Sequence, residues 1–226
     1  MTTQPPVRTF HPRRGRMGAR QRDAIERLWD RYARTVPDGA GPALDLPELF
    51  GRVAPVVLEI GSGAGEATVA QATAAPERDW LAVEVHTPGI AQLLAALEAT
   101  GLGNVRVVRA DALELLRHRL APDSLAAIHV YFPDPWPKAR HHKRRIIQPA
   151  HTALLASRLR PGGVLHCATD WPEYAAAMLD ALGAEELLEN TVDGYAPRPA
   201  YRPVTRFEQR ALHAGRPIAD LVFRRR

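Results

Sequence analysis

The sequence predicts an α/β protein built on one mostly parallel β-sheet with helices on both faces. Short apolar runs alternate with helical patterns along most of the chain, beginning at residue 55. Glycines and prolines separate the runs, as they do after the buried apolar stretch "PVVLEI". Regular alternation of strand and helix predicts a parallel sheet that is covered by helices on both faces.

Seven strands are expected, five alternating with helices and two more near the C-terminus at one edge of the sheet. These strands are residues 55–60, 80–85, 105–110, 125–132, 164–169, 186–193 and 217–225. The expected helices are residues 20–35, 65–75, 88–101, 113–120, 148–159 and 171–183. Pro88 at the start and Gly101 at the end of one of them are the asymmetry expected of a helix.

The chain is expected to divide into a basic N-terminal arm and helix, residues 1–36, and an α/β domain, residues 37–226. A length of 226 residues fits one domain of moderate size with an extra arm. The first part of the larger region, residues 37–52, carries enough proline and glycine to predict a connector. Residues 194–207 form a Pro- and Arg-rich loop, and long loops of this kind are usually functional or disordered.

Composition narrows the class of protein. Hydrophobic residues make up 46% and charged residues 24%, which are ordinary globular values. Cys167 is the single cysteine, which excludes a disulfide or a cysteine zinc site within one chain and suits a reducing cytosol. No apolar run reaches transmembrane length, and no apolar stretch follows the first arginines. We therefore expect a cytoplasmic protein with no membrane partner. The sequence does not decide between a monomer and a homodimer.

Positive charge is concentrated in three segments. The net charge is +5 and the pI is near 9.9, which favours an anionic partner. The basic segments are residues 8–34, residues 138–145 and the last three arginines.

A glycine-rich segment follows the first strand of the α/β domain. Gly61, Gly63 and Gly65 form a G-x-G-x-G pattern where a ligand can approach the backbone. Glu66 stands where a dinucleotide fingerprint needs glycine or alanine, and an acid there would repel a pyrophosphate. No Walker lysine follows, which excludes nucleoside triphosphates. The pattern favours a ligand without a pyrophosphate.

Three acids stand at the ends of the first three strands of this domain. They are Glu59, Glu84 and Asp111. An acid after the second strand can accept both hydroxyl groups of a ribose. S-adenosylmethionine (SAM) carries a ribose, an adenine amino group and an ammonium, all of which carboxylates can bind. The three acids and the glycines together predict a SAM site.

The segment "FPDPWPK" follows the fourth of these strands. Asp134 lies between Pro133 and Pro135, which restrict the backbone and hold the carboxylate on a short rigid ledge. Preorganisation of this kind favours a positioned reaction. Two roles are open for Trp136: stacking on a nucleic-acid base, or anchoring the edge of the core.

A basic strip continues from this ledge. Residues 138–145 contain five basic residues and no acidic one. The basic residues are Lys138, Arg140, Lys143, Arg144 and Arg145. A run of charge beside a candidate active site favours phosphate binding over a merely solvated face. The adjacent His141 and His142 cannot face one site on a helix, so we expect backbone or RNA contacts and no metal site. His129 and Cys167 fall inside strands and are expected in the core.

The chain resembles bacterial tRNA (guanine-N7)-methyltransferases almost from end to end. The matching stretches are "RTFHPRRGRM", "LEIGSGAG", "AVEVHTPGI", "ADAL", "YFPDPWPKARHHKRRIIQP", "LRPGG", "ATDWPEYA" and "RPVTRFEQRAL". The resemblance implies the Rossmann-like class I fold of SAM-dependent methyltransferases. It also implies formation of 7-methylguanine at the variable-loop guanine, position 46, of tRNA, with SAM as methyl donor and S-adenosylhomocysteine as product.

The resemblance also assigns site residues. It implies SAM contacts from Glu59, Glu84, Asp111 and Asp134, with Asp134 as the catalytic residue and the three glycines as part of the cofactor site. Substrate contacts are implied for Lys138, Asp170, Thr205, Arg206, Phe207 and Glu208. An RNA-binding strip is implied for Arg140, His141, His142, Lys143, Arg144 and Arg145.

The chemistry of guanine N7 suits these residues. Its in-plane lone pair is unprotonated at neutral pH, so the attack needs placement and neither a strong base nor a metal. We expect Asp134 to hold the guanine by accepting from its ring N–H and amino groups, with Asp170 and Glu208 as candidate helpers. Three alternatives stay open: a SAM enzyme acting on another RNA or a small molecule, a non-enzymatic RNA-binding module, and, least favoured, an NAD enzyme.

Overall fold

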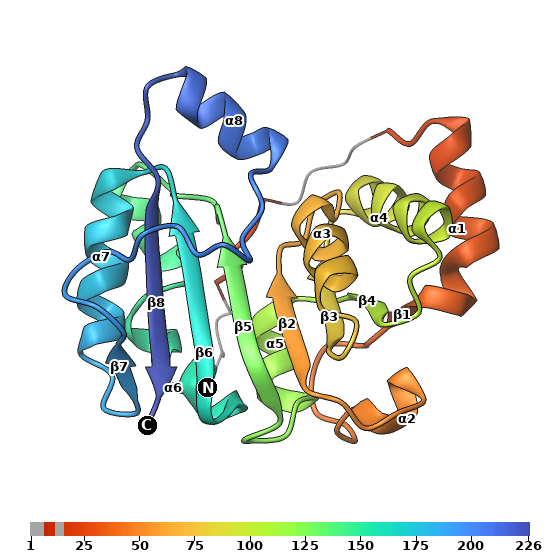
Figure 1. Ribbon diagram of the computed structural model, residues 1–226, viewed down its shortest axis with the longest axis horizontal. Coiled ribbons are helices and arrows are strands. Elements are labelled where there is room, and N and C mark those ends of the chain that lie inside the picture. Colours follow the sequence, from red (N-terminus) through yellow and green to blue (C-terminus); the bar gives the residue numbers. More distant parts are fainter. Residues whose placement is uncertain (1–6, 12–15) are drawn as a thin grey trace, which may run out of the picture.

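The computed structural model describes residues 7–11 and 16–226 and contains one eight-stranded sheet (Figure 1). The strands are β1 (Ala33–Thr35), β2 (Val56–Ile60), β3 (Asp79–Glu84), β4 (Val105–Arg109), β5 (Leu125–Tyr131), β6 (Leu159–Thr169), β7 (Leu188–Asn190) and β8 (Ala219–Arg225). Their order across the sheet is β1-β4-β3-β2-β5-β6-β8-β7. All neighbouring pairs from β1 to β6 are parallel, and β8 runs antiparallel to both of its neighbours. The mostly parallel α/β fold is confirmed.

The sheet has one strand more than the seven that the sequence predicts. The helix expected at 20–35 ends at Tyr32, and the next three residues form β1. Ala33 pairs with Val107 of β4, which offers its free edge to a parallel neighbour. Helical periodicity cannot show that these three residues form a strand, because their pairing partner lies far along the chain.

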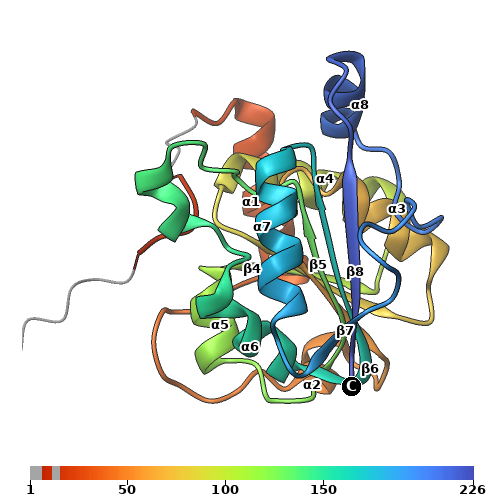
Figure 2. The ribbon, with the colours of Figure 1, turned by 90° about the vertical axis from the view of Figure 1, so that its left-hand side faces the viewer.

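Helices cover both faces of the sheet (Figures 1 and 2). One core contains residues of α1 (Ala19–Tyr32), α3 (Glu66–Ala74) and α4 (Thr87–Thr100). The other contains residues of α5 (Ala112–His118), α6 (Pro149–Arg158) and α7 (Pro172–Gly183). Successive residues of one strand pack into opposite cores, as expected of a strand that is buried on both sides. In β2, Val57 lies in the first core and Leu58 in the second.

The N-terminal helix packs as part of this α/β unit. Leu28 and Tyr32 of α1 are buried in the same core as Leu94 of α4, and β1 extends the sheet. The core and the sheet are continuous across residue 36. The division of the chain into two parts at that residue stays a prediction.

The structure contains three short helices in segments that were not expected to be helical. They are α2 (Leu46–Phe50), the 3₁₀ helix η1 (Ala139–Arg144) and α8 (Arg206–His213). Thr205 caps α8 by accepting from the backbone N–H of Glu208 at 3.3 Å, and Asp45 caps α2 in the same way through Glu48. The Thr-x-x-Glu spacing at residues 205–208 is a capping signal that could have predicted α8.

One half of the sheet is covered on one face by a loop. The segment that leads from β7 to α8 crosses in front of β5, β6 and β8 (Figure 1). Tyr201 in this segment stacks on His129 of β5, with ring centroids 5.8 Å apart. The loop expected at 194–207 is therefore an ordered layer over the sheet. Among the described residues, no helix is both long enough and apolar enough to cross a membrane.

Candidate active site

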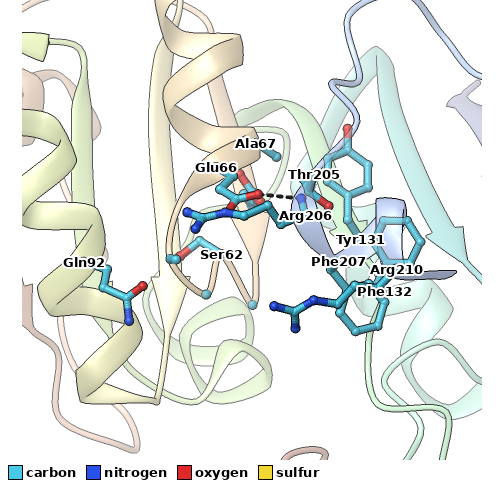
Figure 3. Close-up of a pocket in the computed structure, with 14 residues that line it drawn as sticks. Ser62, Glu66, Ala67, Gln92, Tyr131, Phe132, Thr205, Arg206, Phe207 and Arg210 are labelled. Carbon is cyan, nitrogen blue, oxygen red and sulfur yellow. Dashed lines mark hydrogen bonds and ion pairs between the residues drawn. The ribbon is translucent and has the colours of Figure 1, made fainter. Parts of the chain in front are cut away.

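Two adjoining cavities lie at the carboxyl ends of the parallel strands. The first measures about 380 Å³ and lies between the glycine-rich loop and α8 (Figure 3). The second measures about 330 Å³ and lies between the end of β3, the Asp134 ledge and the arm at Thr9–His11. Gly61, Tyr131, Phe132 and Phe207 line both cavities. This edge of a parallel sheet is the usual ligand site in open α/β folds.

The glycine loop is shaped by three residues in the left-handed region. Gly61, Gly63 and Gly65 have φ values of 75°, 55° and 79°. A Cβ added to Gly61 or Gly63 would meet no atom within 4 Å, so the open space beside both backbones belongs to the cavity. At Gly65 an added Cβ would lie 2.3 Å from Leu93 Cδ1, so that position is needed for packing.

Glu59 lies at the base of the first cavity. Its side chain is buried, and Thr68 Oγ1 donates a 2.5 Å hydrogen bond to Oε2. Burial raises the pKa of Glu59 to about 7, although the Thr68 bond opposes the shift. A cationic group in the cavity would favour the ionised form.

Glu84 lies at the end of β3 and lines the second cavity. Its Oε2 accepts from Gly63 N at 2.8 Å, and its Oε1 accepts from Val85 N at 2.7 Å and His86 N at 2.8 Å. These bonds orient the carboxylate and tie the glycine loop to β3. Carboxylate oxygens retain further acceptor capacity beyond three bonds.

Asp111 is directed differently from the other two strand-end acids. Its Oδ1 accepts from Leu113 N at 2.9 Å and caps α5, and burial raises its pKa. Its neighbours Ala110 and Ala112 line the second cavity, but Asp111 itself does not. Its cofactor contact stays a prediction.

Asp134 lines the second cavity on a ledge with unusual backbone geometry. Phe132 and Trp136 have φ values of 51° and 47°, in the left-handed region that side chains rarely adopt. Phe132 N donates to Ala168 O at 2.7 Å, and Pro135 O accepts from Arg145 Nε at 2.9 Å. Strained backbone held by such bonds is a common feature of functional sites.

Trp136 anchors the N-terminal arm. It is buried against two side chains: the guanidinium carbon of Arg144 lies 3.7 Å from the ring centroid, and the His11 ring stacks on it with centroids 4.7 Å apart. Its indole N–H donates to Thr9 O at 3.2 Å. Arg144 Nε and Nη2 donate to Arg8 O and Phe10 O, each at 3.0 Å. In this conformation the anchoring role applies, since the ring is buried against the arm and only 4% exposed.

Some side chains of the basic strip are exposed to solvent, and others are bound to other parts of the protein. Lys138, Arg140 and Lys143 are exposed. Arg145 is buried and forms two hydrogen bonds with Glu173, at 3.0 and 2.5 Å. The histidines are partly buried: His141 meets Trp136 edge-on at 6.0 Å, and His142 Nε2 lies 4.0 Å from Glu173.

Helix α8 forms one wall of the first cavity. Thr205, Arg206, Phe207 and Arg210 line it, and Arg206 binds Glu66 across the opening through its backbone N–H at 2.7 Å and its Nε (Figure 3). Burial raises the pKa of Glu66, but the hydrogen bonds and charge of Arg206 outweigh it, so the pKa falls.

Three of the expected substrate residues do not line either cavity. Glu208 is buried in an ion pair with Arg202, at 2.5 Å. Asp170 pairs with Arg216 at 2.8 Å, and Lys138 points to solvent from the strip. Their substrate contacts stay predictions. Five further residues line the first cavity without having been expected from the sequence: Ser62, Gln92, Tyr131, Phe132 and Arg210.

The chain is similar in sequence and in fold to known methyltransferases. A family model described as "Putative methyltransferase" matches residues 53–221. A tRNA (guanine-N(7)-)-methyltransferase of Bordetella pertussis is 54% identical over 97% of this chain and 85% of its own length. One from Nitrosomonas eutropha is 52% identical, over 99% and 98%. The crystal structure of the 16S rRNA methyltransferase KamB shares the fold, with a TM-score of 0.57 and 20% identity over 85% of this chain and 98% of that one. The chain therefore belongs to the tRNA (guanine-N7)-methyltransferase family.

Proposed function

We propose that this protein is a SAM-dependent enzyme that forms 7-methylguanine at the variable-loop guanine, position 46, of tRNA. The observation that carries the proposal is the position of Asp134. It lines the second cavity, which shares Gly61 of the glycine loop with the first, and the exposed cations Lys138, Arg140 and Lys143 follow it closely along the chain. The high identity to named tRNA methyltransferases supports the same substrate. Because tRNA is the substrate, we infer that the protein is located in the cytoplasm.

The residues of the two cavities fit SAM. Glu84 has acceptor capacity for ribose hydroxyls, Glu59 can ionise beside an ammonium, and Gly61 and Gly63 leave room at the backbone. Arg206 and Arg210 supply positive charge for a carboxylate at the α8 side of the first cavity. When bound, SAM supplies a methyl group activated by its sulfonium.

The chain's own contribution is placement of the base. Asp134 has two carboxylate oxygens that can accept from the ring N–H and the amino group of one guanine. Phe132 and Phe207 pack together at 5.1 Å between the cavities and offer an apolar surface to a base face. Because N7 carries a free lone pair, holding the base in line with the methyl group is the main requirement.

The assignment is tested by incubating the full chain with tritiated SAM and bulk tRNA, followed by nucleoside analysis. We expect the label in 7-methylguanosine. Label in another nucleoside, or transfer to small molecules alone, would overturn the substrate assignment.

Asp134→Ala is predicted to lower turnover on a tRNA transcript by about 100-fold or more, since misplacement of a substrate by about 1 Å can cost that much. SAM affinity, measured by calorimetry, is predicted to change far less. Asp134→Asn is the matched control for size, and it should also lose activity because its amide replaces one acceptor with a donor. Near-normal methylation by Asp134→Ala would exclude a positioning role for this carboxylate.

A further inference from the structure

A buried ionic cluster lies behind the first cavity. We call Arg202, Glu208, Asp220 and His166 the Arg202 cluster. Arg202 is 1% exposed, and its guanidinium donates to both carboxylates. It binds Asp220 at 2.6 and 2.9 Å and Glu208 at 2.5 and 3.0 Å. Forks of this kind are among the strongest and most directional hydrogen bonds in proteins.

The cluster connects to the wall that both cavities share. His166 Nε2 lies 2.8 Å from Asp220 Oδ1, and its Nδ1 lies 3.2 Å from Tyr131 Oη and 3.0 Å from Tyr201 Oη. The Arg202 guanidinium carbon lies 6.0 Å from the Tyr131 ring centroid and 5.7 Å from that of Phe132. Tyr131 and Phe132 are thus fixed from behind by polar groups that never reach the cavity.

The same cluster attaches α8 to the body of the protein. This helix stands above the sheet edge in both views (Figures 1 and 2), and only Glu208 and Ala211 of its residues are buried. Glu208 lies in the first turn, directly after Phe207 and two residues before Arg210, both of which line the first cavity. The ion pair from Arg202 to Glu208 therefore sets where Arg206, Phe207 and Arg210 stand.

We propose that Arg202 is a positioning residue of the methyl-transfer reaction, and that Glu208 acts through Arg202 and not on the substrate. The inference rests on the proposed function, because it assigns α8 and the Tyr131–Phe132 wall to the site where tRNA and SAM meet. It replaces the expectation that Glu208 contacts the guanine.

The burial of the cluster explains why its members depend on one another. Glu208 and Asp220 are each 2% exposed and share the one guanidinium. Breaking a buried ion pair by removing one partner is costly, because the other charge is left uncompensated. A lysine keeps the charge of Arg202 but cannot form two forks at once. Loss of either partner should therefore release α8 in the same way.

The test is a double-mutant cycle with Arg202→Lys, Glu208→Gln and the double variant, assayed on a tRNA transcript. We expect each single change to lower kcat/KM for tRNA by roughly 10- to 100-fold, the range that small misplacements produce. The kcat/KM of the double variant should lie within about threefold of that of the less active single variant, because the two changes break one interaction. SAM affinity of the folded protein should fall as well, which a role in stability alone would not cause.

The matched control uses the same substitutions in an exposed ion pair. Arg224 and Glu189 lie 3.8 Å apart and are 55% and 47% exposed. Arg224→Lys and Glu189→Gln should leave kcat/KM within about twofold of the wild type, as expected of a surface pair.

Several outcomes would overturn the proposal. Multiplicative losses in the double variant, or a large loss in Glu208→Gln with wild-type activity in Arg202→Lys, would assign Glu208 to the substrate. If Arg202→Lys does not fold, a cycle of Glu208→Gln and Asp220→Asn carries the same expectation, because both carboxylates act through Arg202. A wild-type enzyme that forms no 7-methylguanosine would instead overturn the proposed function.

Discussion

Glu59 illustrates how burial sets the state of one carboxyl group at the base of the site. Within residues 7–11 and 16–226, no lysine or arginine forms an ion pair with it: its hydrogen-bond partner is Thr68, and nearby Glu84 adds repulsion. The neighbouring His129 is buried, which lowers its pKa and keeps it neutral. Burial therefore raises the pKa of Glu59 to about 7. In the free protein this shift makes stability fall as pH rises from about 4.5 to 7, since the native state holds the proton more tightly than the unfolded chain.

The proposed contact between Glu59 and the ammonium of SAM predicts a proton release on binding. Ammonium binding favours the ionised carboxylate, so the SAM dissociation constant should fall as pH rises from 5 to 7. The slope approaches about tenfold per pH unit for one proton. Calorimetry in two buffers of different ionisation enthalpy measures the protons released. Glu59→Gln should bind with little pH dependence in this range, and an unchanged dependence in that variant would refute the contact.

At the scale of elements, the glycine loop depends on how closely α4 approaches it. Gly89 lies in the first turn of α4, and a Cβ there would lie 2.7 Å from Gly63 O. The loop is held from the other side by the bond between Gly63 N and Glu84. The open backbone at Gly63 is therefore a product of helix packing as well as of the loop's own residues.

Gly89→Ala is predicted to weaken SAM binding by roughly tenfold. Alanine favours a helix over glycine by about 1 kcal/mol, but overpacking costs about 1–3 kcal/mol and would displace Gly63. A tenfold change corresponds to about 1.4 kcal/mol. Calorimetric titration with SAM measures the change. Gly183→Ala, at the end of α7, is the control, since its added Cβ meets nothing within 4 Å. Equal affinities in the two variants would contradict the packing explanation.

At the scale of the whole molecule, positive charge near the site performs two different tasks. Lys143 and Arg140 face solvent beside the Asp134 ledge. Arg145 is buried, where it binds Glu173 and Pro135 O and lies over the Tyr174 ring at 4.6 Å. Arg144 holds the N-terminal arm against Trp136. Only exposed cations are free to replace the counterions of an RNA backbone.

This division predicts different salt responses within one basic strip. Lys143→Ala and Arg140→Ala should each reduce the slope of log affinity for tRNA against log salt concentration by about 1, because each removes one phosphate contact. Arg145→Ala should leave the slope unchanged and lower the free energy of unfolding by about 1–3 kcal/mol, through its lost charged hydrogen bonds. Filter binding between 50 and 200 mM salt and denaturant unfolding measure the two effects. A reduced slope in Arg145→Ala would instead identify it as an RNA contact.

Most of the sheet was predictable because its strands and helices carry local patterns. The apolar run at 55–60, the Pro88 start of α4 and the Gly61–Gly65 segment each signal their structure within a few residues. The 3₁₀ helix at 139–144 and β1 were not predicted, since neither has a periodic apolar face and β1 depends on the free edge of β4. The left-handed backbone of Phe132 and Trp136 was also missed, because the proline rule only disfavours the right-handed helical region.

The sequence by itself determined the α/β class, the edge of the sheet that holds the site, and the family, because these follow from local periodicity and from motifs contiguous in the chain. The tertiary structure alone decided which of several similar side chains are free to act. Arg206 binds Glu66 from 140 residues away, Trp136 holds Thr9 from 127 residues away, and Arg202 joins Glu208 to Asp220. A charged or aromatic residue looks the same in sequence whether it faces solvent or a buried partner, and only the folded chain brings that partner within reach.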